Sequence, residues 1–418
     1  MNDFRYYLIR TRFAGRFFYN EIFVKKNYVF IQHVFFYFVD LFLKIILNNS
    51  HKKTLHKILQ NNRKQILLFS PTIPWNGPLF QRPQQLALSF AKHGFLVFYA
   101  TTSCKTDNVF GFRKITNNLF LTNRMDLVQS LPSTGIIYFT STALLNVTAL
   151  RKLQASSKVI LYDYIDAIHP ALSGGAVENA HLTTHKTILK DENIIVVSTA
   201  DKLHKEVLKY RSKNCLLATN GVDYKHFSKK FSSKASPKEL HKIIQNGFPV
   251  IGYFGALASW FDYNLVIKAA KMRPKLHFVL IGWNYDSTLN KYKKQMYNNI
   301  SIIGPRDYLI LPKYASLFDV SIIPFKINKV TESTSPVKLF EYMALGKPIV
   351  TTNLPECRKY KSVLIGKNGE EFVNRLDEAL KLRNNKNYLK ILKKEALENT
   401  WDIKVKDIKK LLSVNLNI

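Results

Sequence analysis

The chain has few cysteines and few acidic residues. Its three cysteines, Cys104, Cys215 and Cys357, are scattered and odd in number, which favours a reducing cytosol and argues against a metal site. Asp and Glu number 29 against 62 Lys and Arg, so the formal net charge is +33. This excess predicts anionic partners such as nucleic acid, acidic phospholipid surfaces or phosphorylated substrates. A Lys-rich solvated surface is the alternative explanation for part of it.

Two further absences narrow the choice of partner and location. The chain has no Arg-rich tail and no interleaved aromatic motif of an RNA-binding domain, so membrane surfaces and phosphates rank above nucleic acid, and no nucleic-acid partner is expected. No small-residue cleavage site follows a short apolar core near the start, which argues against a cleaved signal peptide. With 418 residues, 46% of them apolar, the chain is long enough for two globular domains and an extension.

Residues 1–64 differ in character from the rest of the chain. Several basic residues precede the apolar run 28–47, which is long enough to span a bilayer. On a helix, however, His33, Tyr37, Asp40 and Lys44 fall on one narrow face. Because a charge in mid-span costs about 2.5 to 3.5 kcal/mol, a basic amphipathic helix lying in an acidic membrane interface is favoured. A helix packed on the protein's own core and a true span are the alternatives.

After residue 64, strands and helices alternate in two segments. The first opens with the apolar strand QILLFS, and the second opens with VIGYFG. This alternation predicts an α/β protein with doubly wound parallel sheets. The turn-rich segment 220–223 and the polar stretch after it mark the connection. We therefore expect one domain over 65–235, a second over 236–400 and a final helix over 401–418.

Ligands of such sheets bind beyond the carboxyl ends of the strands. In the first predicted domain, two loops in that position carry polar or aromatic residues. These residues are Trp75, Asn76, Gly77 and Arg82 after the first strand, and Asp163, Asp166 and His169 after a later one.

The most sharply delimited element of the second domain is the helix within SPVKLFEYMALGKPIVTT, residues 335–352. Pro336 suits the first helical position, and Gly346 followed by Pro348 ends the helix. Thr334 or Ser335 is placed to cap it. The β-branched run that follows predicts a strand, so the helix belongs to an α/β layer.

The start of this helix predicts an anion site, because free backbone N–H groups and the helix dipole favour negative charge there. Lys338 adds a positive charge one turn in, and Glu341 offers a carboxylate that can accept two hydrogen bonds from adjacent hydroxyls. Phosphate at the helix start and a diol at the carboxylate would together bind a nucleotide sugar. The alternative is an ordinary capped helix with a solvated Lys and Glu.

Five passages in this order resemble the GT-B-fold glycosyltransferases of glycosyltransferase family 4, particularly the bacterial branch active in surface polysaccharide assembly, such as teichuronic acid glycosyltransferases. The resemblance covers residues 65–415. The passages are RPQQLALSFAKHGFLVFYAT at 82–101, NGVD at 220–223, IGYFGALASWFDYNLV at 251–266, GPRDYLILPKYASLFDVSIIPF at 304–325, and SPVKLFEYMALGKPIVTT.

The resemblance implies two Rossmann-like domains facing a cleft, with the sugar nucleotide held mainly by the second and the acceptor by the first. It also implies roles for individual residues. In the second domain, Glu341 would bind the ribose hydroxyls and Lys338 the diphosphate. The phosphates would also meet the amides of Ser335, Pro336 and Val337 and the backbone of Gly255, and Arg306 would lie near the base. In the first domain, Asp166 and His169 would lie near the reacting sugar, and the acceptor would be bound by Trp75, Asn76, Gly77 and Arg82.

The chain departs from the family pattern at two places. Many retaining members carry two glutamates separated by seven residues, but Ser333 stands eight positions before Glu341, with Glu332 one residue out of register. An Arg that often follows the equivalent of Gly255 is Ala256 here. Arg306 and Lys338 are the candidates to supply the missing charge.

The expected function is transfer of a sugar, hexosyltransferase-type, from a nucleoside diphosphate sugar to a hydroxyl of a glycan or lipid-linked acceptor in cell-surface polysaccharide synthesis. The chain has no Asp-x-Asp pair to hold a divalent ion against a diphosphate, so no metal and no cofactor besides the donor are expected. Retention of configuration follows from the resemblance, and the expected location is cytoplasmic, peripheral at the inner face of the plasma membrane.

Alternatives stay open at two levels. For the whole chain they are a catalytically silent, membrane-attached scaffold of a polysaccharide assembly complex and a sugar-nucleotide epimerase on the same fold. For single residues there are two alternatives each. Asp166 acts on the acceptor hydroxyl, by orienting or deprotonating it, or it caps a helix. His169, before Pro170, has a catalytic or a structural role, and Arg82 faces the acceptor's phosphate or sits in its loop.

Overall fold

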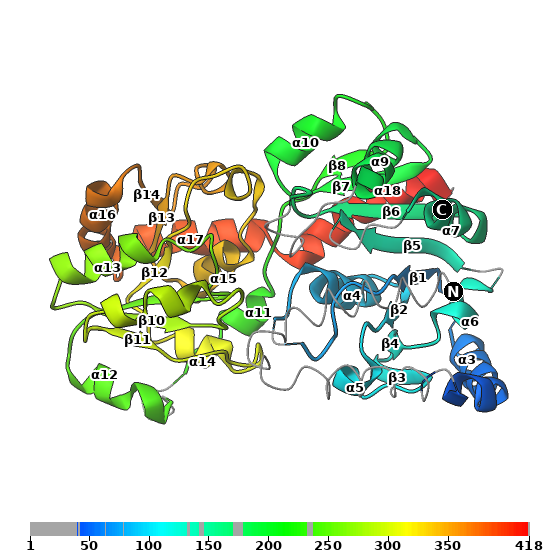
Figure 1. Ribbon diagram of the computed structural model, residues 1–418, viewed down its shortest axis with the longest axis horizontal. Helices are drawn as coiled ribbons and strands as arrows, with labels where there is room; N and C mark the ends of the chain where they lie inside the picture. Colours follow the sequence, from blue (N-terminus) through cyan, green and yellow to red (C-terminus); the bar gives the residue numbers. More distant parts are fainter. Residues whose placement is uncertain are drawn as a thin grey trace. The chain divides into compact units, whose positions relative to one another are not determined.

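The computed structural model describes residues 40, 42–62, 64–77, 79–131, 134–141, 146–169, 179–231 and 237–416. The chain divides into two compact units, shown in Figure 1. The first domain ends at Ala218 and also includes Val405–Ile418, and the second domain is Thr219–Lys404. The division lies ahead of the expected one at residue 235 because Val222, Phe227 and Leu240 pack into the core of the second domain.

In the described part of the first domain, eight strands form one sheet in the order β3-β4-β2-β1-β5-β6-β7-β8. The expected parallel α/β sheet is confirmed for all pairs except β3 with β4, which are antiparallel. Only two residues separate these two strands, too few for a parallel crossover. The strands are β1 Ile66–Phe69, β2 Leu96–Ala100, β3 Phe112–Thr116, β4 Leu119–Thr122, β5 Thr134–Thr140, β6 Val159–Tyr164, β7 Ile194–Ser198 and β8 Cys215–Leu217.

The helices of the first domain pack on this sheet and on one another. α4 begins at Arg82, because Pro83 occupies its first turn and Gln81 forms a capping box with Gln84. The helices are α3 Asn48–Gln60, α4 Arg82–Lys92, α5 Cys104–Asp107, α6 Met125–Gln129, α7 Val147–Ser156, α9 Asn179–Lys190 and α10 Asp201–Val207.

The second domain contains a wholly parallel sheet in the order β11-β10-β9-β12-β13-β14. Its central strands are fully buried and largely apolar, with His277 and Ser321 as polar exceptions, as expected of parallel strands covered on both faces. The strands are β9 Val250–Phe254, β10 His277–Ile281, β11 Ile300–Ile302, β12 Val320–Ile323, β13 Ile349–Thr352 and β14 Val363–Gly366, and the helices are α11 Tyr224–Phe227, α12 His241–Gln245, α13 Tyr263–Met272, α14 Leu311–Ala315, α15 Val337–Leu345, α16 Gly369–Leu382 and α17 Lys386–Glu398.

The last helix, α18 Trp401–Leu416, begins in the second domain and continues in the first. In the first domain, the Lys409 ammonium donates to the backbone oxygen of His93 (3.1 Å), and the Asn415 side-chain amide donates to the Asn214 side chain (3.0 Å). Both contacts are exposed, so they fix the register of α18 on the first domain more than its stability.

Residues 1–39 and 41 lie outside the described residues, so the expected interfacial helix over 28–47 can be followed only from Asp40 onward. There the chain is helical over 42–46 and continues into α3. Asp40, His51 and Leu55 are buried against the first domain, so this part follows the alternative of a helix packed on the protein's own core. No helix among the described residues has the length and apolar character to cross a membrane.

Candidate functional site

Three adjacent strands of the second domain end in glycine. Gly255 follows β9, Gly282 follows β10, and Gly304 stands two residues after β11. The Gly255 N–H donates to the Ile281 oxygen (2.9 Å) and the Gly282 N–H to the Gly304 oxygen (3.0 Å). A Cβ at Gly282 would lie 1.8 Å from the Gly255 oxygen, and Gly255 has φ +133°. At this edge, which we name the glycine edge, the backbone segments approach one another too closely for side chains at these positions.

Helix α15 starts one residue later than expected. Pro336 is extended (φ −70°, ψ 119°) and occupies the N-cap position, and the helix begins at Val337 with no side-chain cap. The expected caps are wrong because both hydroxyls have other partners: Ser335 Oγ accepts from the Asn220 N–H (3.3 Å), and the Thr334 hydroxyl donates to the Val330 oxygen (3.0 Å). Pro336 itself has no N–H to offer a phosphate. The Leu339 N–H donates to the Pro336 oxygen (3.1 Å), whereas the N–H groups of Val337 and Lys338 have no intrahelical partner.

Lys338 lies against the glycine edge. Its Nζ is 4.9 Å from the ring centre of Phe325 and 5.4 Å from that of Tyr253, so it is held by cation–π contacts. A Cβ added at Gly255 would lie 2.8 Å from Lys338 Cε, which shows how closely the two residues approach. Burial lowers the pKa of Lys338 to about 8. Lys338 is thus half-buried and held by the two rings, unlike the solvated lysine of the alternative reading.

Glu341 lies one helical turn beyond Lys338 and is only 6% exposed. Burial raises the pKa of its carboxyl to about 8, and the nearby Lys338 opposes this shift. Within the described part of the chain, no group donates a hydrogen bond to this carboxyl. A buried carboxyl without donors is costly, so the site is left incomplete by the protein alone.

Arg306 has a partner of its own near Gly304. Its guanidinium lies 2.8 Å from Glu239 Oε1 and 5.1 Å from the ring centre of Tyr314. The Tyr314 hydroxyl donates to the same oxygen (2.6 Å), and this hydrogen bond, with that of Arg306, lowers the pKa of Glu239 to about 2. The charge of Arg306 is thus shared with Glu239, and it is Lys338 that lies at Gly255.

The position eight residues before Glu341 is structural. Ser333, in the 3-10 turn Thr331–Ser333, is 1% exposed and its hydroxyl donates to the Val330 oxygen (2.9 Å). Glu332 precedes it and is half-buried. The second glutamate of the family pattern therefore has no counterpart at this position.

Asp166 of the first domain follows β6. The Ser141 hydroxyl accepts from the N–H groups of Ile165 and Asp166 (3.2 and 3.3 Å) and donates to the Asp166 backbone oxygen (3.1 Å). Burial, with a smaller contribution from the Asp163 carboxylate, raises the pKa of Asp166 to about 7. Asp166 caps no helix among the described residues, and His169 is half-buried next to residues that are not described.

Arg82 is part of a closed ion pair. Its guanidinium binds both oxygens of Asp163 (2.7 and 3.0 Å), and the Tyr138 hydroxyl donates to Asp163 as well (2.5 Å). Arg82 is 2% and Asp163 1% exposed. The expectation that Arg82 merely sits in its loop is wrong, because it is the first residue of α4 and holds β6. Its contact with an acceptor stays a prediction.

The loop of Trp75, Asn76 and Gly77 is fixed by a carboxylate that the sequence analysis missed. The N–H groups of Trp75 and Asn76 donate to the two oxygens of Asp107 (2.9 and 2.8 Å), which is fully buried at the end of α5. Gly77 closes the turn by donating to the Pro74 oxygen (3.3 Å). An isolated Asp in an otherwise polar stretch gave no signal of this role.

Residues 248–381 match the protein family described as Glycosyl transferases group 1. The Bacillus subtilis (strain 168) protein TuaH, whose name refers to a glycosyltransferase of teichuronic acid biosynthesis, is 25% identical over 273 residues, which are 61% of this chain and 67% of TuaH. The matched residues lie within the second domain, so this domain is similar to the group 1 glycosyltransferases. The resemblance stated from the sequence is thus confirmed.

Solved structures place the glycosyltransferase in the GT-B fold. Sucrose-phosphate synthase from Thermosynechococcus elongatus aligns with a TM-score of 0.61 at 15% identity, over 85% of this chain and 100% of the synthase. Anabaena HepE, crystallised with UDP-glucose, aligns with a TM-score of 0.62 at 14% identity, over 84% of this chain and 100% of HepE. The expected fold of two Rossmann-like domains is confirmed.

Beside its glycine edge the glycosyltransferase carries an aromatic cluster. The ring centres of Trp260 and Tyr285 lie 5.3 Å apart, and those of Trp283 and Tyr285 lie 5.7 Å apart. The loops after β9 and β10 that carry them are joined through Leu257, whose N–H donates to the Trp283 oxygen (2.8 Å). The sequence analysis missed Gly282 and the aromatic residues after it. A glycine directly after a buried strand was the available signal.

Proposed function

We propose that this glycosyltransferase moves a sugar from a nucleoside diphosphate sugar to a hydroxyl of a glycan or lipid-linked acceptor in cell-surface polysaccharide synthesis, at the inner face of the plasma membrane. The observation that carries the proposal is the buried Glu341 carboxyl, which has no donor among the described residues and lies one turn from Lys338 at the glycine edge. The UDP-glucose bound by HepE and the pathway in the name of TuaH support the donor and the setting.

The ribose of the donor would complete the site at Glu341. Two adjacent hydroxyls can donate to the two oxygens of a carboxylate, and hydrogen bonds to a charged group contribute about 1.5 to 3 kcal/mol each. Donor binding would then favour the ionised carboxylate and reverse the effect of burial on its pKa.

The diphosphate would meet Lys338 and the first-turn N–H groups of α15. Separation of the leaving group increases the negative charge on the diphosphate, and fixed donors in a buried site stabilise that charge without reorganising. Lys338 is held in place by Tyr253 and Phe325, so its ammonium is already positioned. At the glycine edge the backbone of Gly255 lies close to Lys338, so the phosphates would meet the ammonium beside a residue without a side chain.

In the first domain, Asp166 is the proposed base for the acceptor hydroxyl. A carboxyl whose pKa is about 7 accepts a proton more readily than an ordinary aspartate at neutral pH. We further propose retention of configuration and independence from metal ions. Proton NMR of the new anomeric centre tests the first, and activity in the presence of EDTA tests the second.

The deciding experiment is binding and slow hydrolysis of a panel of nucleoside diphosphate sugars. We expect one donor to bind to the wild-type protein and to be hydrolysed, and Glu341→Ala to lose both while the protein stays folded. Glu378→Gln, an exposed glutamate of the same domain paired with Arg375, is the matched control and should behave as wild type. If no donor binds at millimolar concentration, the catalytically silent scaffold replaces this proposal.

A further inference from the structure

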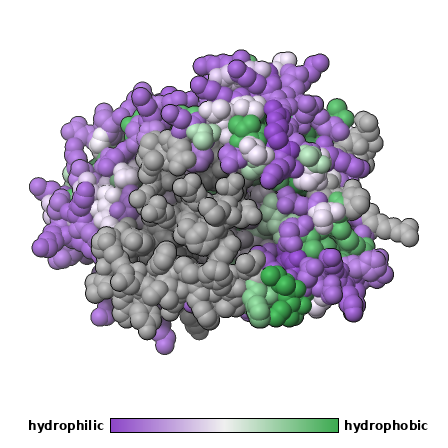
Figure 2. Space-filling model, turned by 45° about the vertical axis from the view of Figure 1, so that its right-hand side comes forward, coloured by the Kyte–Doolittle hydropathy of each residue, from purple (hydrophilic) through white to green (hydrophobic). Residues whose placement is uncertain are grey.

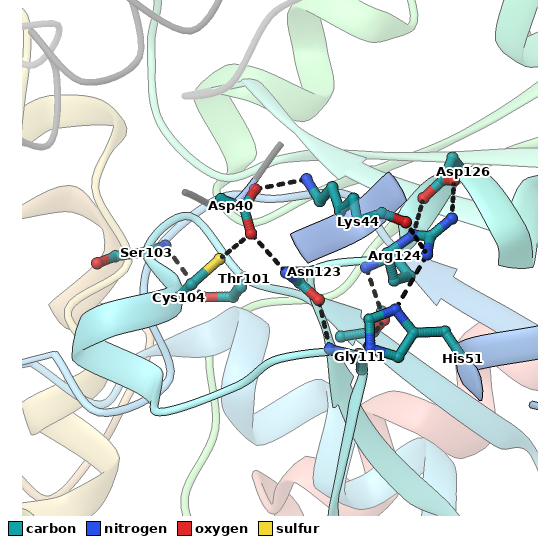
Figure 3. Close-up of polar contacts among 11 residues, drawn as sticks. Asp40, Lys44, His51, Thr101, Ser103, Cys104, Gly111, Asn123, Arg124 and Asp126 are labelled. Carbon is teal, nitrogen blue, oxygen red and sulfur yellow. Dashed lines mark hydrogen bonds and ion pairs between the residues drawn. The ribbon is translucent and has the colours of Figure 1, made fainter. Parts of the chain in front are cut away.

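The helical segment before the first strand has a polar face that is fastened to the first domain (Figure 3). Asp40 is 7% exposed, its carboxylate accepts from the Asn123 amide (2.7 Å), and it pairs with Lys44 one turn on (2.7 Å). The Asn123 oxygen in turn accepts from the Gly111 N–H (2.7 Å). These contacts fix the rotation of the segment about its axis.

Arg124 supplies the second half of this attachment. It is 3% exposed, and its guanidinium reaches His51 Nδ1 (3.0 Å) and the Lys44 backbone oxygen (3.3 Å), as Figure 3 shows. The same guanidinium donates to Asn48 Oδ1 (2.8 Å). Asp126 neutralises the charge of the same guanidinium at 2.8 Å. We name this set, Asp40, Lys44, Asn48, His51, Asn123 and Arg124, the polar clamp.

The opposite face of the segment points away from the domain. Phe42, Ile45 and Ile46 are 61%, 69% and 58% exposed, and their spacing places them on one side of a helix. The hydrogen bond from His51 N–H to the Leu47 oxygen (2.8 Å) carries the helical register into α3. A hydrophobic group of side chains stands among hydrophilic ones at the lower edge of Figure 2.

In the next turns the same side of the helix becomes basic. Lys52, Lys53 and Lys57 are exposed and lie at helical positions that continue the line of Ile45 and Ile46. We name the six residues Phe42, Ile45, Ile46, Lys52, Lys53 and Lys57 the outer face. Its order, apolar and then cationic along one helix, matches the depth profile of a bilayer surface, where acyl chains lie beneath anionic phosphates.

We propose that the outer face lies on an acidic phospholipid surface, with its apolar side chains among the acyl chains and its lysines at the lipid phosphates. The net charge of +33 favours an anionic partner of this kind. The polar clamp orients the helix, since Asp40 and Lys44, which would oppose insertion, are turned onto the protein. The inference rests on one part of the proposed function, the location at the inner face of the plasma membrane, and does not depend on sugar transfer.

The test uses the full chain in flotation with vesicles of phosphatidylcholine, with and without phosphatidylglycerol. Wild type should float with the acidic vesicles. The triple variant Phe42→Ser, Ile45→Ser, Ile46→Ser should partition about tenfold less. Charge reversal at Lys52, Lys53 and Lys57 should remove the preference for phosphatidylglycerol. The control variant Leu397→Ser, Val414→Ser removes apolar residues that are 43% and 75% exposed on α17 and α18, and should float as wild type.

Two flotation results would overturn the proposal: wild type does not float, or the triple variant floats as much as wild type. A third result would be a wild-type dimer and a monomeric triple variant in light scattering, because the outer face would then be a contact between copies of the chain. Donor hydrolysis in vesicle-free solution and the melting temperature of the triple variant should equal those of wild type. A failure of this surface is thereby distinguished from a failure of the proposed function.

Discussion

Each domain holds a buried carboxyl group beside a cationic side chain at the carboxyl edge of its sheet, and the two pairs are built in opposite ways. In the first domain, Asp163 receives both nitrogens of Arg82 and the Tyr138 hydroxyl, so its oxygens are satisfied. In the second, Glu341 has Lys338 nearby but no hydrogen-bond donor among the described residues. A satisfied pair holds a fold together, whereas an unsatisfied one is available to a ligand.

The largest expected effect is on stability and comes from breaking the satisfied ion pair of the first domain. Arg82→Ala should lower the free energy of unfolding by about 3 to 5 kcal/mol, because Asp163 would stay buried without its cation. Urea denaturation measures this loss. Arg151→Ala, which removes an exposed partner of Asp191, is the control and should cost less than about 1 kcal/mol. An equal loss of unfolding free energy in the two variants would show that the ion pair of Arg82 with Asp163 does not stabilise the fold more than an exposed pair does.

The next prediction is that a change at the unsatisfied pair of the second domain alters donor affinity without lowering the stability of the protein. Glu341→Gln should lower donor affinity about 10- to 100-fold, since it removes charged acceptors for the ribose hydroxyls. Its melting temperature should not fall, because no buried ionisable carboxyl remains. Calorimetric titration and thermal unfolding give the two numbers. A variant that loses stability and affinity together would mean that Glu341 supports the fold, as Asp163 does.

A smaller effect distinguishes the two candidate cations of the second domain. Lys338→Ala should weaken donor binding about tenfold, since its ammonium lies at the glycine edge. Arg306→Ala should change affinity little, because its charge is paired with Glu239. Donor titrations of both variants decide this, and the reverse order would place the diphosphate at Arg306.

The last prediction concerns the pH profile of stability, to which the buried Glu341 carboxyl contributes although Lys338 opposes the effect of burial on its pKa. The pKa of Glu341 is raised from 4.5 to about 8, so the folded protein binds this proton more tightly than the unfolded chain. The associated stability is present below pH 4.5 and is lost as pH rises through 8. Urea denaturation across this range should show a smaller decline for Glu341→Gln, and parallel profiles would contradict the assignment.

Local sequence pattern was sufficient to predict where helices and strands lie, but not which distant residues their side chains bind. The end of α15 at Gly346, with φ +68°, and the strand after it follow from local pattern. The cap failed because Ser335 bonds to Asn220, 115 residues away. Arg82 and Asp163, 81 residues apart, both stood at predicted strand ends, yet nothing local pairs them. The family resemblance placed Gly255 and Lys338 in one site, and the structure brings these two residues together.

The central claim is that the buried Glu341 carboxyl is completed by the hydroxyls of a donor. It is tested most directly by titration calorimetry of the bound nucleoside diphosphate sugar near neutral pH, in buffers of different ionisation enthalpy. Because burial keeps this carboxyl protonated and hydroxyl donors favour its ionised form, wild type should release a proton on binding, and Glu341→Gln should release none. Binding without proton release, at equal affinity in both proteins, would contradict the account.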